Sequence, residues 1–194
     1  MASRRSVLVT GSSGKLGRVV TPLFAQAGYE IVTIGRRDAA LIADLSDPAS
    51  VAAALSPDRS FDILLHLMGG FAEGDTPAVW DEMVRLNLLP AAWLIPRLLP
   101  GMRARRWGRI LAVGSQAAET RPAGIAAYVA TKAALHALIQ ATAAGLRGSG
   151  VTANAVLPTT IGPASPAVEI GEALLYLASD AAAHLNGVLL PLGE

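Results

Sequence analysis

The first 35 residues hold the feature that most restricts the fold of this chain. Residues 6–10 are apolar and rich in valine, which is typical of a strand buried on both faces. Three glycines spaced G-x-x-G-x-x-G follow at Gly11, Gly14 and Gly17, and apolar residues then recur at helical spacing up to Gly28. A second strand is expected over residues 29–34. A strand, a glycine turn, a helix and a strand in this order predict a βαβ unit with a right-handed crossover.

The same alternation continues to the end of the chain. Short apolar runs predict strands, and helical spacing or capping residues predict helices between them. The expected strands are residues 41–45, 61–67, 109–113, 151–157 and 188–190. The expected helices are a short one starting at Pro48, residues 77–105 kinked or divided at Pro90 and Pro96, residues 126–146 and residues 166–178. Strict alternation predicts an α/β fold in which helices cover both faces of a parallel sheet in one domain.

Composition excludes several classes of protein. The 194 residues suffice for one domain with a full core, and 52% of them are apolar. The formal net charge of +1 gives no electrostatic reason for nucleic acid or a membrane to be a partner, and the basic run at residues 103–109 is expected to be a solvated turn. With no cysteine and no metal-ligand spacing among three histidines, neither disulfides nor a metal site is expected. No signal peptide or membrane-spanning run is recognisable, so we expect a cytoplasmic protein.

The glycine-rich turn has the chemistry of a phosphate site. Glycines let the backbone approach a pyrophosphate, and the helix end behind them offers N–H groups and partial positive charge. The spacing alone is weak evidence, since a glycine-rich turn without a ligand also fits it. Its position after the first strand of an α/β chain favours a dinucleotide. The predicted contacts are Gly11, Ser13, Gly14, Lys15, Leu16 and Gly17.

The end of the second strand is where a dinucleotide fold contacts the adenosine ribose. An acidic residue there would accept from the 2′-hydroxyl and favour NAD, but this chain has Arg36 and Arg37. Guanidinium groups suit a 2′-phosphate, so we predict NADP(H), while Asp38 keeps NAD(H) open. The alternative is that both arginines are solvated surface residues.

Three polar residues between positions 109 and 135 have catalytic potential. Ser115 follows an expected strand, and Tyr128 and Lys132 lie at i and i+4 of an expected helix, where their side chains share one face. A hydroxyl, a phenol and an ammonium group placed together can handle a proton at a carbonyl oxygen. A tyrosine pKa of about 10 is too high for easy deprotonation, and we expect the Lys132 cation, together with the positive charge of an oxidised nicotinamide, to lower it. The alternative for Tyr128 is an ordinary half-buried tyrosine.

Eight segments in order resemble the short-chain dehydrogenase/reductase family over nearly the whole chain. They are residues 10–17 (TGSSGKLG), 43–46 (ADLS), 68–70 (MGG), 86–88 (LNL), 113–115 (VGS), 128–132 (YVATK), 154–158 (NAVLP) and 172–180 (EALLYLASD). Each segment is weak evidence, whereas the full ordered set is specific. The resemblance implies a Rossmann-type doubly wound parallel sheet of about seven strands in the order 3-2-1-4-5-6-7, in three α/β/α layers.

The resemblance also implies roles for individual residues. Tyr128 is implied as the general acid/base, and Lys132 as its electrostatic partner and a ribose ligand. Ser115 would hold the substrate carbonyl, and Asn87 would steady a proton relay to Lys132 through water. Further implied cofactor contacts, from adenine to nicotinamide, are Asp44, Leu45, Met68, Gly69, Gly70, Pro158, Thr160 and Ile161.

The chain also departs from the family pattern. It is shorter than usual, and most of the shortfall lies between Thr160 and Pro166, so we expect a single domain over residues 1–194 with a shortened substrate lid near residues 159–166. His66 stands where an asparagine is common. The close glycine spacing, residues 68–71 (MGGF), residues 157–160 (LPTT) and the short lid resemble dihydropteridine reductases in part. That resemblance adds a planar pterin-like or quinonoid substrate to the possibilities.

These observations predict an NADP(H)-dependent oxidoreductase that transfers a hydride between the nicotinamide and a carbonyl or imine substrate. One alternative is a pterin or quinonoid reductase with the same fold. A second alternative, suggested by the short lid, is a non-catalytic NADP(H)-binding sensor or scaffold. Because the family pairs through its two long helices, here residues 77–105 and 126–146, a homodimer or homotetramer is expected.

Overall fold

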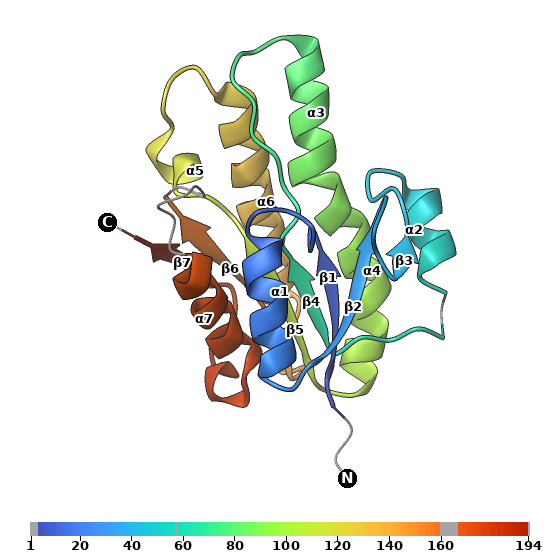
Figure 1. The fold of residues 1–194 in the computed structure, drawn as a ribbon. Helices are drawn as coiled ribbons and strands as arrows, with labels where there is room; N and C mark the ends of the chain where they lie inside the picture. The colour runs from blue at the N-terminus through green and yellow to red at the C-terminus, as the bar shows by residue number, and fades with distance from the viewer. Residues whose placement is uncertain (1–3, 57, 160–166, 194) are drawn as a thin grey trace.

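The computed structural model describes residues 4–56, 58–159 and 167–193, and within them seven strands form one parallel sheet (Figure 1). The strands are β1 (Ser6–Thr10), β2 (Glu30–Gly35), β3 (Leu41–Ile42), β4 (Ile63–His66), β5 (Gly108–Val113), β6 (Val151–Pro158) and β7 (Leu189–Leu192). Their order is β3-β2-β1-β4-β5-β6-β7, which confirms the predicted fold class. Because the order reverses between β1 and β4, the carboxyl ends of these strands form the crevice in which such sheets bind ligands.

Alternate strand residues face opposite sides of the sheet and build two apolar cores. Val7 and Val9 of β1 belong to the core that includes α1 (Gly17–Gln26) and α7 (Ala167–Ala178). Leu8 belongs to the other core, with α2 (Pro48–Ala54), α4 (Leu89–Ala104) and α6 (Ala126–Ala144). In Figure 1, α1 and α7 lie in front of the sheet and α4 and α6 behind it. The central strands β1, β4, β5 and β6 are thereby buried on both faces, as the apolar run of residues 6–10 predicts for β1.

The predicted long helix of residues 77–105 is divided at Leu88. It forms α3 (Pro77–Asn87) and α4, and the backbone of Leu88 departs from helical geometry at φ −121° and ψ −55°. Pro90 lies in the first turn of α4, where its missing N–H leaves no helical bond unmade. Pro96, a predicted kink or break, lies inside α4 instead. The break at Leu88 places Asn87 at the end of α3, beside the carboxyl ends of the strands.

Two predicted boundaries differ for local reasons. The strand expected over residues 41–45 ends at Ile42, because the Asp44 carboxylate accepts from the backbone and hydroxyl of Ser46 and turns the chain toward α2. The segment between the strand expected at residues 109–113 and the helix expected from residue 126 contains the short helix α5 (Ala117–Thr120). The predicted start of α2 is confirmed, because Asp47 caps it by accepting from two backbone N–H groups. None of the described helices is long and apolar enough to cross a membrane.

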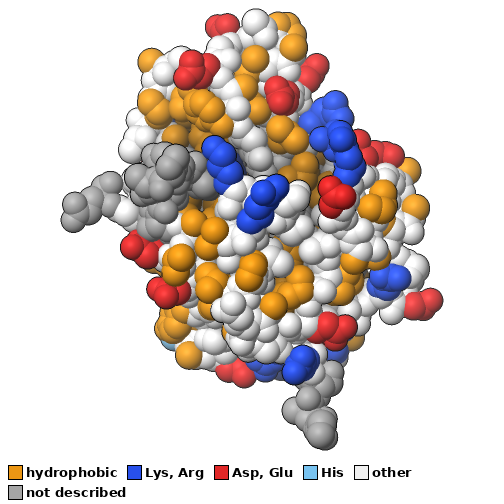
Figure 2. Space-filling model, in the orientation of Figure 1, with side chains coloured by type: hydrophobic (Ala, Val, Ile, Leu, Met, Phe, Trp, Pro, Cys, Tyr) orange, Lys and Arg blue, Asp and Glu red, His pale blue; other side chains and the backbone are white. Residues whose placement is uncertain are grey.

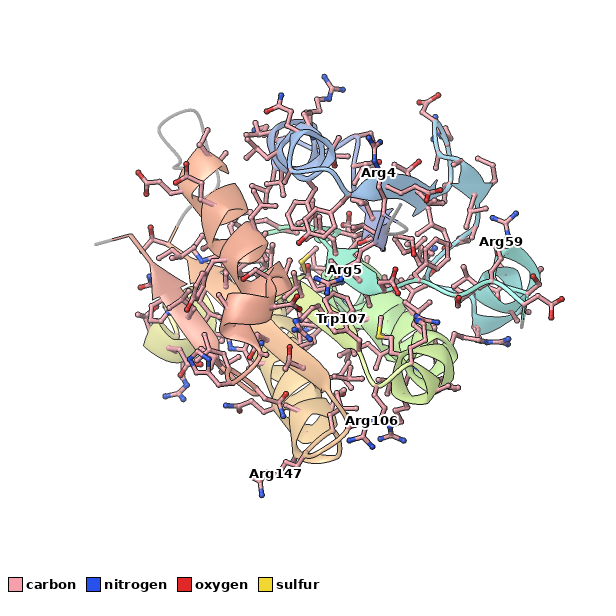
Figure 3. All side chains as sticks on the ribbon, turned by 90° about the horizontal axis from the view of Figure 1, so that it is seen from below. Arg4, Arg5, Arg59, Arg106, Trp107 and Arg147 are labelled. Carbon is pink, nitrogen blue, oxygen red and sulfur yellow. The ribbon has the colours of Figure 1, made fainter. Side chains whose placement is uncertain are left out.

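The basic run at residues 103–109 is a solvated turn only in part, because residues 103–106 are exposed whereas Arg109 is buried. Arg103 donates to the carbonyl of Gly145, and Arg106 donates to that of Gly148, so both satisfy acceptors where α6 ends. Figure 3 views this end of the molecule, with Arg5 beside Trp107 near its centre and Arg106 and Arg147 toward the rim. Arg109 is buried, and its guanidinium lies 4.4 Å from the Trp107 ring. These arginines therefore join turns that are distant in the sequence.

Candidate active site

The predicted catalytic residues Ser115, Tyr128 and Lys132 meet beyond the carboxyl end of β5. Ser115 stands two residues after this strand, and the other two lie in the first two turns of α6. The Lys132 Nζ donates to the carbonyl oxygen of Val113, the last residue of β5, at 2.9 Å. Ser115 lies close enough to the Tyr128 side chain to exert a lowering influence on the pKa of the phenol. The helical i, i+4 spacing and the strand end thus bring the three groups together, as the sequence predicts.

The backbone and hydroxyl of Ser115 are held on three sides. Its Oγ accepts from the Ala117 N–H at 3.2 Å, its carbonyl accepts from the Ala118 N–H at 3.2 Å, and its own N–H donates to His136 Nε2 at 3.3 Å. The side chain is buried. In its bond with the Ala117 N–H, the Ser115 Oγ accepts and does not use its own proton. The hydroxyl can therefore still donate to a partner beside Tyr128.

Burial is the main influence on the titration of Tyr128 and Lys132. It raises the pKa of Tyr128, against a smaller lowering by the side chain of Ser115. Burial also lowers the pKa of Lys132 from 10.5 to about 8. In the protein by itself, partial burial of the Tyr128 phenol is the larger influence, and the Lys132 ammonium is hydrogen-bonded to the backbone of β5. A lowering of the Tyr128 pKa by Lys132 together with an oxidised nicotinamide stays a prediction.

Asn87 joins three segments around the site. Its Oδ1 accepts from the Gly70 N–H at 2.9 Å, and its Nδ2 donates to the Gly70 carbonyl at 3.1 Å and to Thr131 Oγ1 at 3.3 Å. A Cβ at Gly69 would lie 3.0 Å from Asn87 Oδ1 and 3.1 Å from Lys132 Nζ. The loop after β4 therefore packs closely against α3 and α6. The relay role predicted for Asn87 stays a prediction.

A cleft of about 390 Å³ lies between the glycine turn and the end of β2. Eight predicted cofactor residues line it: Gly11, Ser13, Gly14, Arg36, Arg37, Leu45, Met68 and Gly69. The sequence prediction missed seven others: Ser12, Ile34, Gly35, Asp38, Ala39, Ala43 and Leu67. Each is close in sequence to a predicted contact. A left-handed backbone at Asp38 (φ 50°) accompanies the turn that returns residues 38–39 to the cleft.

A second cleft, of about 440 Å³, shares Arg36 and Met68 with the first and includes the predicted Asp44. Hydrogen bonds from Ser46 are the main cause that lowers the pKa of Asp44, and nearby Arg36 and Arg85 lower it further. Asp44 is therefore a carboxylate near neutral pH. Figure 2 shows Lys and Arg side chains gathered above the start of α1 and beside α3 on this face.

The remaining predicted cofactor residues lie around these clefts without lining them. Gly17 belongs to the turn itself, since a Cβ there would overlap the Gly11 carbonyl oxygen. Leu16 is part of the apolar core beneath α1, Lys15 is exposed, and Pro158 ends β6 and accepts from the Gln116 N–H. Gly70 is held by Asn87, as described above. Thr160, Ile161 and the predicted lid lie outside the described residues.

Comparisons with known proteins give the family. The family model for short-chain dehydrogenases matches residues 49–169, which is more than half of the chain. This chain belongs to the short-chain dehydrogenase family.

Short-chain dehydrogenases from several bacteria resemble the chain over most of its length. D-beta-hydroxybutyrate dehydrogenase of Cupriavidus necator is 30% identical over 183 residues, covering 81% of this chain and 71% of the relative. The 3-oxoacyl-acyl-carrier-protein reductase FabG of Escherichia coli is 26% identical over 227 residues, covering 94% and 93%. A solved oxidoreductase of the short-chain dehydrogenase/reductase family from Burkholderia thailandensis is 30% identical with a TM-score of 0.84, covering 98% and 91%. Membership in this family supports the prediction that the protein is an oxidoreductase that uses a nicotinamide dinucleotide.

Three residues beside the site of this short-chain dehydrogenase escaped the sequence prediction. His136 contacts both Glu119 and the backbone of Ser115, and its position one turn after Lys132 is the signal that could have identified it. Phe71 is 60% exposed, and its ring centroid lies 5.1 Å from that of Tyr128 at an interplanar angle of 74°. Among the described residues, no group of three His, Asp or Glu side chains could hold a metal ion.

Proposed function

We propose that this short-chain dehydrogenase is an NADP(H)-dependent oxidoreductase acting on a carbonyl or imine substrate and its reduced counterpart. The observation that carries the proposal is the meeting of Ser115, Tyr128 and Lys132 at the carboxyl end of β5, beside the dinucleotide cleft. Two relatives are named as a 3-oxoacyl reductase and a hydroxybutyrate dehydrogenase, which supports a carbonyl and alcohol pair as the substrate class.

The glycine turn fits the proposed cofactor. Gly17 packs so closely on Gly11 that a side chain would not fit, and the turn lines the cleft at the N-terminal end of α1, where partial positive charge suits a pyrophosphate. Asp44 and Leu45 border the two clefts on the adenine side, and Met68 and Gly69 continue along the first cleft from there. When bound, NADP(H) supplies or accepts the hydride.

The protein's own residues handle the proton. Ser115 donates its hydroxyl proton to the substrate heteroatom and holds it beside Tyr128, which donates a proton during reduction and removes one during oxidation. The raised pKa of Tyr128 keeps the phenol protonated near neutral pH, which suits the reductive direction. Lys132, with its Nζ bound to Val113, adds a second proton donor at the same end of β5.

Replacing Tyr128 with phenylalanine tests this assignment. We expect turnover to fall by about 100-fold or more, the usual contribution of a general acid/base, with NADPH affinity nearly unchanged. The matched control is Tyr176→Phe, which removes the hydroxyl of a tyrosine that is 49% exposed on α7. Full turnover by the Tyr128→Phe protein on any substrate would refute the proton-transfer role. NADPH binding by the wild type without turnover on a broad carbonyl and imine panel would instead favour the sensor alternative.

The preference for NADP(H) over NAD(H) rests on Arg36 and Arg37. Both are exposed beside the cleft, and no described carboxylate lies within salt-bridge distance of either guanidinium, so both can contact a 2′-phosphate. Arg36→Ala should weaken NADPH binding by about tenfold to 100-fold, the value of a charge-assisted hydrogen bond, and affect NADH much less. Asp38→Asn should leave NADPH binding unchanged. Selective loss of NADH binding in Asp38→Asn would make NAD(H) the natural cofactor.

Phe71 favours one particular substrate class, a flat cyclic imine or quinonoid compound such as a dihydropterin. An exposed aromatic ring placed edge-on to the proposed proton donor offers its face for stacking with a planar ring. Comparing kcat/KM for quinonoid dihydropterin and for simple diketones distinguishes this candidate from a general carbonyl reductase. If Phe71 stacks with the substrate, Phe71→Ala lowers kcat/KM for the pterin alone and Phe71→Trp preserves it.

We also propose that the protein forms homo-oligomers through α4 and α6. Ala130, Ala133 and Ala137 are exposed on α6 and would allow close packing of helices. Gel filtration should give a dimer or tetramer, whereas a species near the chain mass of 19.9 kDa would contradict the proposal.

A further inference from the structure

His136 connects Ser115 to a second helix. It lies on α6 one turn after Lys132, and its side chain is almost fully buried. Its Nε2 is 3.3 Å from the Ser115 backbone nitrogen, and its Nδ1 is 3.2 Å from Glu119 Oε1 on α5. One imidazole ring therefore contacts the end of β5, α5 and α6 at the point where the three converge.

The partners of His136 determine its tautomer. The Ser115 N–H can only donate, so Nε2 accepts and carries no proton in the neutral ring. The proton is then on Nδ1, where it is donated to the Glu119 carboxylate. In the other tautomer, the Nε2 proton would face the Ser115 N–H, so two donors would meet. The unprotonated Nδ1 would face the Glu119 carboxylate, so two acceptors would meet. The neutral ring with a proton on Nδ1 is thus the only neutral form that satisfies both contacts.

Gly114 allows this close approach. A Cβ at this position would overlap His136 Nε2 and would lie 3.2 Å from Leu157 Cδ1. The imidazole therefore packs directly on the backbone that precedes Ser115. A glycine here serves the contact with His136, which gives a physical reason for the Gly114-Ser115 sequence at the end of β5.

We propose that His136, oriented by Glu119, is a positioning residue that holds Ser115 at the distance from Tyr128 that the reaction needs. The inference rests on the proposed function, in which Ser115 holds the substrate heteroatom. It extends the site from three residues to a chain that runs from Glu119 through His136 to the Ser115 backbone. His136 touches neither substrate nor cofactor and acts only through Ser115.

The charged groups around His136 predict an acid limit to activity. Glu119 faces it from α5 and Lys132 from α6, while Gly114, the residue after β5 on which the ring packs, carries no charge. Burial holds the pKa of His136 below its ordinary 6.5, Glu119 raises it and Lys132 lowers it. Protonation would turn Nε2 into a donor facing the Ser115 N–H, so turnover should decline as the pH falls through this lowered pKa.

Two substitutions at His136 test the positioning role. His136→Leu removes the acceptor at similar volume and should lower kcat by about tenfold to 100-fold, the effect of a small misplacement, with the KM for NADPH unchanged. His136→Gln places a carbonyl oxygen near the position of Nε2, so it should restore kcat and, having no titrating ring, should lack the acid limit. Equal kcat values in wild type and His136→Leu, or an acid limit that persists in His136→Gln, would overturn the proposal.

A second measurement needs no turnover. Nitrogen-15 NMR of the wild-type protein should find the proton of His136 on Nδ1. Glu119 is 57% exposed, so its substitution should leave the fold intact. Glu119→Ala should shift the proton toward Nε2 and speed hydrogen exchange of the Ser115 amide, whereas Glu119→Gln keeps an acceptor and should change neither. A proton on Nε2 in the wild type would overturn the inference even in an active reductase, while an inactive protein with the expected tautomer would instead count against the proposed function.

Discussion

Replacing His66 with asparagine should make the free energy of unfolding less sensitive to acid. His66 ends β4 and is 1% exposed. Its Nδ1 lies 2.9 Å from Thr10 Oγ1, which also accepts from the Met68 N–H, so the ring is hydrogen-bonded to β1. Among the described side chains, His66 Nε2 is one of the buried atoms without a hydrogen-bond partner. The ring is thus built into the sheet as a neutral group.

The magnitude follows from the shift in pKa. Burial, with a smaller effect of the Lys132 charge, lowers the pKa of His66 from 6.5 to about 3. Because the folded pKa is below the unfolded one, acid protonates the unfolded chain first. The contribution of neutral His66 to stability is fully present above the unfolded pKa and is lost as the pH falls toward the folded pKa. Between about pH 8 and about pH 5 this group alone should cost about 2 kcal/mol.

Urea unfolding of three proteins at these two pH values measures the effect. The control is His184→Asn, which replaces an exposed histidine. At the lower pH, the wild type and this control should each lose about 2 kcal/mol more of their free energy of unfolding than His66→Asn loses. Asparagine suits this position because the resembled family commonly has it there. The same loss of stability in all three proteins would refute the assignment of His66 as a buried neutral histidine.

Two further predictions concern the site. Burial lowers the pKa of Lys132 from an ordinary 10.5 to about 8. The destabilisation of the folded protein by the buried charge is therefore complete below about pH 8 and is gone above about pH 10.5. In urea unfolding, the stability of wild type relative to Lys132→Met should therefore rise by about 3 kcal/mol between about pH 7.5 and about pH 10.5, and a constant difference would contradict this. Gly17→Ala should destabilise the protein by about 2 kcal/mol or more, since its Cβ would overlap the Gly11 carbonyl. Gly14→Ala should destabilise the protein less, because its Cβ would meet only the Gly11 carbonyl oxygen, at 3.3 Å. Equal melting temperatures for Gly17→Ala and Gly14→Ala would contradict this prediction.

The fold was predictable because its signals are local. Alternating apolar runs and helical spacing indicate elements one at a time, and the right-handed crossover rule limits how they join. The break at Leu88 was misplaced to Pro90 because a proline in the first turn of a helix starts the helix rather than ending it. The helix α5 was missed because four residues are too few to give a periodic pattern.

The site was only partly predictable, for reasons of geometry. Tyr128 and Lys132 share a helix face, so their proximity follows from spacing alone. The contact between His136 and Glu119 depends instead on how α5 packs against α6, which no short pattern contains. The raised pKa of Tyr128 in the protein by itself depends on burial, which no short sequence pattern contains.

The basic run at residues 103–109 was misinterpreted in part, for a related reason. Gly145, whose carbonyl accepts from Arg103, and Gly148, whose carbonyl accepts from Arg106, each lie 42 residues further along the chain. Composition identifies a donor but does not indicate a distant acceptor. The depth of Arg109 likewise depends on the packing of Trp107 and Asp180 around it.

Hydride transfer with NADPH that carries deuterium at both C4 positions tests the central claim most directly. We predict that the wild-type protein converts a carbonyl or imine substrate to a product that carries deuterium on the reduced carbon, detected by mass spectrometry. Tyr128→Phe should bind NADPH equally well and form little labelled product. NADPH consumed with no deuterium in the product, or labelled product formed at the same rate by Tyr128→Phe, would contradict the account.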